Sequence, residues 1–483
     1  MTLKIRKTEL LIFFSVFIVY SFFTVLKIAN GIPIEGLSAD YYIQIAENLS
    51  KSFFFSLDGI NPTALRMPGY PLFLAIIFTI FKNWWAVLFI QHAIAGISAV
   101  LLYIISKKWL NKSWAITASL IWAFEPYALD ISSQFFTEPI YVLMLLIMTL
   151  LFIRLKDKIK NPKYFIYIIT ILLAILTYIR PTSLFMPIIF IGIIIYDNKL
   201  KDSNFPHYLF SKKILTKIAL ILMLYISLLF PWSFRNHINF KSWQLSSDSA
   251  SSIYITAQQF SEGKKGIENI PTEIYEESGL PKFKESGLLD KTSLAIKKSA
   301  EIILSHPLDF ALFYTEHLLT DTIGSSWWGS IRNLIKGTSG QINYHQEVKN
   351  AILDFNIKEI ISFSSKEMVA TIIIISGIIF WIVTLLFSVL GAIILFKKSD
   401  TNTKPYIILI TGIILYLLFI GNMAVGDMVR YRFSASPFII MFAISGLLAL
   451  LKKKLKNEKA FLNIPINNIY HYYWCIPHYK SHP

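Results

Sequence analysis

The chain has 483 residues, of which 54% are apolar and 16% charged, and its mean hydropathy is +0.54. A soluble core of this length cannot bury so much apolar surface, so the excess must face lipid and a soluble globular protein is excluded. The formal net charge of +16 does not indicate a nucleic-acid partner, because the basic residues cluster beside apolar runs. The single cysteine, Cys475, excludes an internal disulfide.

The apolar runs predict an all-α polytopic membrane protein with about ten transmembrane helices. In chain order, the predicted spans are residues 9–28, 84–105, 113–129, 138–153, 164–179, 183–196, 215–231, 368–396, 405–421 and 434–450. Lys4, Arg6 and Lys7 precede the first span, and the lysine-rich connections then fall on the same side as this start. We therefore expect a multi-pass protein of the plasma (inner) membrane with both termini in the cytoplasm.

Two outer regions are too long to be simple connectors. They divide the chain into an N-terminal transmembrane module (1–231) with a catalytic first outer loop (28–83), an extracytoplasmic domain (232–366), C-terminal transmembrane helices (367–451) and a cytoplasmic tail (452–483). In the first loop, residues 38–49 predict an amphipathic interfacial helix, and the apolar run 72–81 is too short to span and is expected along the membrane surface. The domain at 232–366 is expected to be mostly helical.

Charged residues at the outer edge of the membrane are costly and therefore candidates for function. They are Asp40 and Arg66 in the first loop, Glu138 at the start of the fourth span, Arg180 and Arg235 where spans five and seven emerge, and Arg430 and Arg432 before the last span. Structural interpretations exist for all of them: Asp40 as a first-turn acid, Glu138 as a helix start before Pro139, and the arginines as side chains that reach lipid headgroups. The nine histidines show no metal-ligand spacing.

Six short motifs occur along the chain in a recognisable order. They are Asp40-Tyr-Tyr-Ile-Gln-Ile-Ala, Arg66-Met-Pro-Gly-Tyr-Pro-Leu, Phe136-Thr-Glu-Pro, Tyr178-Ile-Arg-Pro, Pro231-Trp-Ser-Phe-Arg-Asn and Arg430-Tyr-Arg. Together they resemble the pattern of GT-C membrane glycosyltransferases, closest to the branch that contains the protein O-mannosyltransferases and the aminoarabinose transferases of lipid A. The resemblance covers mainly the first 240 residues.

The resemblance implies transfer of a sugar from a polyprenyl-phosphate carrier to a glycan, lipid or protein acceptor on the outer side of the membrane. Asp40 takes the place of the first-loop acid that acts as general base or orients the acceptor. The implied substrate-binding residues are Arg66, Tyr70, Glu138, Arg180, Arg235, Arg430 and Arg432. Many relatives have an Asp-Glu pair in this loop, whereas Asp40 is followed by Tyr41, which argues against a bound divalent metal; no cofactor is assigned.

The chemistry of these residue types agrees with that assignment. Fixed guanidinium groups stabilise the charge that grows on a departing phosphate, and a carboxylate can accept the proton of an attacking hydroxyl. One carboxylate favours single displacement with inversion. Two other functions stay open: a flippase or transporter of a polyprenyl-linked sugar, and a non-catalytic envelope-assembly subunit. A transporter predicts broken helices near the midplane and repeated halves, whereas the polar residues here gather at the outer edge, which favours the enzyme.

Overall fold

The computed structural model describes residues 6–37, 41–156, 162–199, 211–262, 292–336, 368–421 and 429–462. The regular structure of these residues is helical, with no β-strand and one isolated bridge between Ser56 and Pro62. The helices of the first half are α1 (Lys7–Ala29), η1 (Ile34–Leu37), α2 (Tyr42–Ser52), α3 (Gly69–Phe81), α4 (Trp84–Ser106), α5 (Lys112–Ala123), α6 (Pro126–Ser132), α7 (Glu138–Leu155), α8 (Pro162–Ile179), η2 (Pro181–Ser183) and α9 (Pro187–Lys199). Those of the second half are α11 (Lys212–Phe240), α12 (Asp248–Ser261), α15 (Thr292–Ser305), α16 (Pro307–Ile323), α17 (Trp327–Lys336), α20 (Met368–Lys398), α21 (Lys404–Gly421) and α22 (Val429–Leu462). The predicted all-α class is confirmed.

Six of the described helices are long and apolar enough to cross a membrane, which confirms a multi-pass membrane protein. They are Lys7–Ala29, Trp84–Ser106, Glu138–Leu155, Ile214–Phe240, Met368–Lys398 and Val429–Lys452. Four shorter apolar helices cover Gly69–Phe81, Tyr164–Ile179, Pro181–Tyr196 and Lys404–Ile420. The number of about ten spans includes three of these shorter helices and stays a prediction.

The third predicted span, residues 113–129, is not one continuous helix. Helix α5 ends at Ala123, and α6 begins three residues later at Pro126. Glu125 starts the new helix, because its carboxylate accepts the backbone N–H of Ala128 at 3.0 Å and Pro126 occupies the first helical position. The prediction of an unbroken span here is wrong.

Helix α11 runs further than the predicted span at 215–231. It includes Pro231 and continues to Phe240. The segment that follows folds back along it: the Trp232 indole donates to the carbonyl of Leu245 at 2.7 Å, and the Asn236 amide donates to that of Gln244 at 2.8 Å. These bonds stabilise the last turns of α11, although proline removes one backbone bond from the helix interior.

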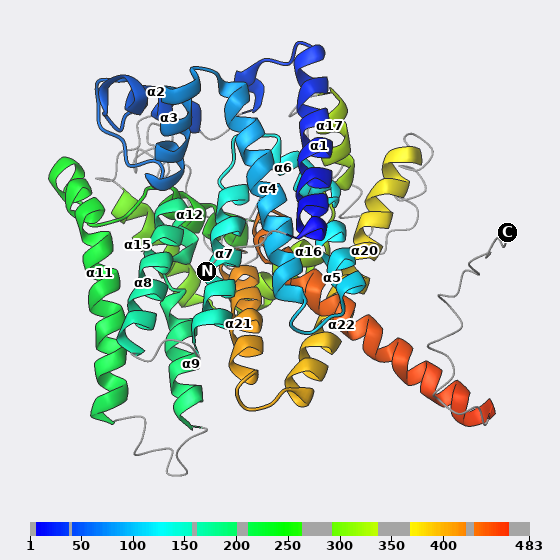
Figure 1. Cartoon of the computed structure of the whole chain (residues 1–483). Helices are drawn as coiled ribbons and strands as arrows, with labels where there is room; N and C mark the ends of the chain where they lie inside the picture. The colour runs from blue at the N-terminus through cyan, green and yellow to red at the C-terminus, as the bar shows by residue number, and fades with distance from the viewer. Residues whose placement is uncertain are drawn as a thin grey trace.

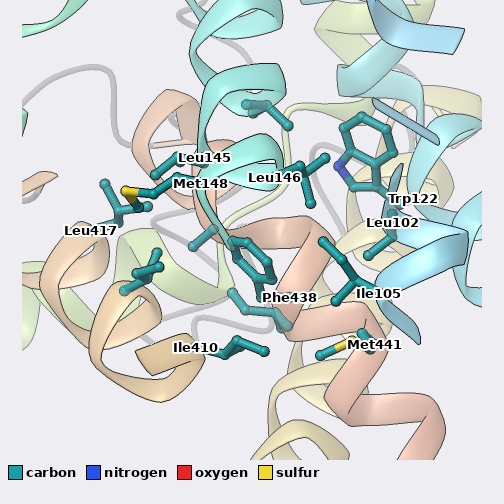
Figure 2. Close-up of a cluster of buried hydrophobic side chains, with 14 of the residues drawn as sticks. Leu102, Ile105, Trp122, Leu145, Leu146, Met148, Ile410, Leu417, Phe438 and Met441 are labelled. Atoms are coloured by element: carbon teal, nitrogen blue, oxygen red, sulfur yellow. The ribbon is translucent and has the colours of Figure 1, made fainter. Parts of the chain in front are cut away.

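The main apolar core is formed by helices from both halves of the chain, and Figure 2 shows part of it. Its members include Leu102 and Ile105 of α4, Trp122 of α5, Leu145, Leu146 and Met148 of α7, Ile410 and Leu417 of α21, and Phe438 and Met441 of α22. Helices α20 and α22 pack very closely beside this core, because a Cβ atom on Gly391 would overlap the carbonyl of Phe442, and one on Gly446 would overlap that of Phe387. The relative position of these two helices is therefore fixed by backbone contact.

The first outer loop has a core of its own. Tyr42 and Ala46 of α2 pack with Tyr70 and Leu74 of α3 and with Leu88 of α4. Figure 1 shows α2 and α3 together at one end of the molecule, the end at which α1 finishes. The amphipathic helix predicted in this loop is confirmed as α2, and its position at a membrane surface stays a prediction. The described parts of residues 232–366 are mostly helical, while the division into domains also stays a prediction.

Candidate functional site

Glu138, the first residue of α7, is fully buried and holds two arginines. Arg180 Nη1 donates to its Oε1 atom at 2.8 Å, and Arg430 Nε donates to the same oxygen at 2.7 Å. Arg180 directly follows α8 and Arg430 is the second residue of α22, so three distant parts of the sequence meet. These three side chains carry a combined formal charge of +1, a composition suited to attract an anion where water is scarce.

Aromatic rings fix the planes of both guanidiniums. Arg180 lies over Tyr431 at 4.9 Å and over Tyr141 at 5.6 Å from the ring centroids. Arg430 lies over the ring of Phe136 at 4.4 Å. Such contacts attract a cation and limit its movement, so the cluster of Glu138, Arg180 and Arg430 is pre-organised.

The turn after Arg180 is held by hydroxyl groups from two other helices. Tyr416 of α21 donates to the carbonyl of Thr182 at 2.6 Å, and Tyr225 of α11 donates to that of Leu184 at 3.2 Å. Tyr141 and Ser183 share a hydrogen bond of 2.7 Å between their hydroxyls. Arg180 is therefore positioned by a turn that several helices support.

Two of the sequence motifs pack directly against each other at this point. A Cβ atom added to Gly69 of the Arg66-Met-Pro-Gly motif would lie 2.6 Å from the carbonyl oxygen of Tyr178. Only glycine allows the backbone of α3 to approach the end of α8 so closely. The first outer loop is thus in contact with the turn that carries Arg180.

Tyr70 is fully buried and connects the loop to the segment before Glu138. Its hydroxyl donates to Gln91 Oε1 at 2.6 Å, and Gln91 Nε2 donates to the carbonyl of Gln134 at 2.8 Å. The backbone N–H of Phe135 in turn donates to the carbonyl of Leu37 at 3.0 Å. Arg66 lies over the ring of Tyr42 at 5.3 Å, on the loop side of this network.

Arg235 has partners of a different kind. Its Nη1 atom donates to the carbonyl of Thr63 at 2.7 Å, and its Nη2 atom donates to that of Phe55 at 3.3 Å. The guanidinium also lies 4.8 Å from the centroid of the Trp232 ring. Arg235 therefore joins α11 to the first outer loop, and the structure does not bring it to Glu138.

Arg432 is directed away from Arg430, because side chains two positions apart on a helix point about 200° apart around its axis. It donates to the carbonyl of Thr322 at 2.7 Å and to that of Gly324, and it lies 3.9 Å from the ring centroid of Trp381. These contacts join the start of α22 to the end of α16.

Asp40 lies outside the described residues. The residue after it, Tyr41, has φ 59° and ψ 13°, a left-handed conformation that bulky side chains rarely adopt. Such outliers cluster at functional sites and motivate a test of this segment. Within the described ranges, no group of three or more His, Cys, Asp or Glu side chains could hold a metal ion.

Two buried acids, Glu125 just before α6 and Asp130 within it, were not among the candidates from the sequence. Glu125 Oε1 accepts the indole N–H of Trp327 at 2.6 Å, and Asp130 accepts from Gln134 at 2.7 Å and from Asn333 at 3.2 Å. Burial raises the pKa of Asp130 to about 6, although the charge of Lys27 and these hydrogen bonds lower it in part. Both acids join α6 to α17. Glu125-Pro126 repeats the pattern of Glu138-Pro139, a signal that could have marked the first of them.

The comparisons with known proteins concern part of this site. Residues 63–232, which include Arg66, Glu138 and Arg180, match the family model described as dolichyl-phosphate-mannose-protein mannosyltransferase. No curated protein matches the chain. Among solved structures, the crystal structure of the Archaeoglobus fulgidus oligosaccharyltransferase, tethered with an acceptor peptide containing the NVT sequon via a disulfide bond, is similar with a TM-score of 0.46 and 13% sequence identity. That match covers 93% of this chain and 50% of the other, so this chain spans about half its length. The family match confirms the resemblance to GT-C membrane glycosyltransferases over residues 63–232.

Proposed function

We propose that this protein is a membrane glycosyltransferase that moves a hexosyl or pentosyl group from a polyprenyl-phosphate carrier to a glycan, lipid or protein acceptor. The reaction takes place on the extracytoplasmic side of the plasma (inner) membrane, and both termini lie in the cytoplasm. The single observation that carries the proposal is the buried cluster of Glu138, Arg180 and Arg430 within and beside the stretch that matches the mannosyltransferase family.

The two arginines of this cluster bind the carrier phosphate. A guanidinium has five N–H donors, so Arg180 can keep its bond to Glu138 and also donate to a phosphate oxygen. Negative charge grows on that phosphate as the sugar leaves, and two fixed cations stabilise it more in the transition state than in the ground state. Glu138 holds both cations. Its Oε1 atom already accepts from both arginines, so the residue is better suited to anchor them than to transfer a proton.

Asp40 acts as the general base that takes the proton from the acceptor hydroxyl, as the resemblance implies. The hydroxyl oxygen forms a bond to the anomeric carbon while the bond from that carbon to the phosphate oxygen breaks, and the polyprenyl phosphate leaves with the electron pair. A single displacement of this kind inverts the anomeric configuration. Arg66 and Tyr70 support the first loop, and Arg235 and Arg432 contribute by holding the segments around the cluster.

The decisive experiment supplies the purified protein in proteoliposomes with a cell-envelope extract as the source of acceptor and with a panel of polyprenyl-phosphate hexoses and pentoses, and it measures the free polyprenyl phosphate released. The full chain should release it, and Asp40→Asn should lower the rate by about 10²- to 10⁴-fold, because a general base is lost at nearly constant side-chain volume. Arg154→Lys, on the last turn of α7, is the control and should keep the parent rate.

Two other outcomes would contradict the proposal. Movement of the labelled carrier across the bilayer without release of polyprenyl phosphate would indicate a flippase. Neither movement nor release with any donor would indicate a non-catalytic assembly subunit.

A further inference from the structure

Helix α16 (Pro307–Ile323) is apolar on two opposite faces. Its inner face carries Phe310 and Phe313, whose rings contact Phe260 of α12 at centroid distances of 5.3 and 5.4 Å. Its outer face carries Leu308, Leu312 and Leu319, which are 80%, 71% and 61% exposed. At about 100° per residue these three leucines fall within about 40° of one another, so they form one stripe. We call them the leucine stripe.

The depth of α16 is set by two bonds to the ends of membrane helices. The hydroxyl of Tyr314 donates to the carbonyl of Phe419, two residues before α21 ends. Arg432, near the start of α22, donates to the carbonyl of Thr322 at the C-terminal end of α16. The end of α21 and the start of α22 are separated by seven residues, so they belong to the same side of the membrane. Helix α16 therefore lies at the level where these two helices leave the apolar layer.

We propose that the leucine stripe is inserted into the hydrocarbon of the bilayer, and that α16 is an interfacial helix. The stripe extends about 17 Å along the helix. The exposed acids of α16, Asp309 and Glu316, lie to one side of the stripe, about 80° to 100° around the helix from Leu308. A helix that lies in a membrane surface has apolar residues on one face and charges beside them. Helix α16 has this arrangement, and it lies at the edge of the apolar layer.

Acyl chains are the occupant that the geometry favours over water or a second protein. The inner face of α16 packs against α12 and α21, and the helix also contacts α20 and α22, so the stripe continues the lipid-facing surface of membrane helices. The inference does not depend on the proposed function. It places part of residues 232–366 in the membrane surface, whereas the sequence predicts an extracytoplasmic domain there.

The test uses two matched pairs of single-cysteine variants of the full chain in a Cys475→Ser background. Leu308→Cys is paired with Asp309→Cys, and Leu319→Cys with Glu316→Cys. The two sites of each pair lie within one turn of each other along the helix but on different faces. Each cysteine carries a small fluorophore, and the proteins are reconstituted in phosphatidylcholine vesicles. Quenching is measured with doxyl-labelled phosphatidylcholine and with aqueous iodide.

Probes at Leu308→Cys and Leu319→Cys should be quenched several-fold more by the doxyl lipid than their partners, and several-fold less by iodide. Equal quenching by iodide within both pairs would show that the stripe faces water and would overturn the proposal. Protection of the leucine sites from both quenchers would show that a protein covers the stripe, and would overturn it as well. Since all four sites are exposed, the substitutions leave the packing of α16 intact.

Discussion

Arg180 and Arg235 have the same sequence context and different surroundings. Each follows or ends an apolar run, and each has a proline close by. Arg180 donates to the carboxylate of Glu138, whereas Arg235 donates to the main-chain carbonyls of Thr63 and Phe55. From this difference we expect the partner, and not the position beside a membrane helix, to decide the role of each arginine. A guanidinium shared with a second arginine on one carboxylate is suited to an anionic ligand, and one bound to carbonyls is a structural clamp.

The comparison separates two properties of the protein. The cluster of Glu138, Arg180 and Arg430 is expected to control binding of the carrier phosphate. Arg235 is expected to control attachment of the first outer loop to α11, together with Ser247, whose backbone N–H donates to the carbonyl of Ala64 at 3.0 Å. Variants of the two regions should therefore differ in which measurement they change.

The largest effect is expected for Glu138→Gln. The substitution leaves the buried guanidinium of Arg180 and the partly buried one of Arg430 without their carboxylate, and breaking a buried ion pair on one side typically costs about 3–5 kcal/mol. The melting temperature in detergent should fall by several degrees, and carrier binding should be lost. Glu262→Gln, at an exposed position after α12, is the control. A melting temperature equal to that of the control would show that Glu138 does not hold the cluster together.

Arg235→Lys and Arg180→Lys should give opposite results. Lysine at 235 cannot bridge two carbonyls as the planar guanidinium does, so the free energy of unfolding should fall by about 1–3 kcal/mol while the folded fraction binds the carrier normally. Lysine at 180 keeps the charge but loses the bidentate donor geometry, so carrier affinity should fall roughly tenfold. Carrier affinity is measured with the purified variants, and Arg154→Lys is the control. Weaker carrier binding by folded Arg235→Lys would return Arg235 to the phosphate site.

Asp130 provides a test through pH in the polar network that joins α6 to α17. Its pKa is raised from 3.8 to about 6, so the folded chain binds more protons than the unfolded chain between these values. The contribution of Asp130 to the free energy of unfolding should therefore fall as the pH rises from about 4 to 6, by on the order of 1–3 kcal/mol. Thermal unfolding of Asp130→Asn across this range should lack that decrease, whereas Asp309→Asn, at an exposed site, should keep it. The same pH profile for all three proteins would remove Asp130 as the titrating group.

The smallest effect on the structure is expected for cysteines placed at exposed positions. Labelling them tests which side of the membrane the first outer loop and the start of α5 face. Ser247 and Ser330 are buried and are poor labelling sites, although they lie in the predicted outer domain. Ile60→Cys, at a position that is 79% exposed, should react with an impermeant thiol reagent added outside intact cells in a Cys475→Ser background. Lys112→Cys, exposed at the start of α5, should react only after permeabilisation. Reversed labelling would invert the proposed orientation.

Most of the helices were predictable because the apolar runs are long and charge-free. The start of α7 at Glu138 and the amphipathic helix α2 follow from local sequence alone. The break between α5 and α6 was missed because the apolar run continues across it, and only the capping carboxylate of Glu125 marks it. Pro231 suggested a helix end, but bonds from the folded-back segment keep α11 helical to Phe240.

The candidate site was predictable as a set of residues but not as a geometry. Sequence position selected Glu138, Arg180 and Arg430, which meet, and equally selected Arg235 and Arg432, which bind elsewhere. Asp130 was not selected, because burial by α17, about 200 residues later in the chain, is a tertiary effect that no local pattern records. The outer face of α16 was missed for the same reason, since its role depends on where Tyr314 is attached.

The backbone contact between α20 and α22 limits the routes by which a bulky substrate can enter. Gly391 and Gly446 leave no space between the two helices, and even one methyl group at either position meets a carbonyl. Neither helix can rotate about its long axis at this level without separating the contact, so α20 and α22 move together there. Under the proposed function, the lipid carrier therefore does not enter between α20 and α22 at the level of Gly391 and Gly446, where the two backbones touch.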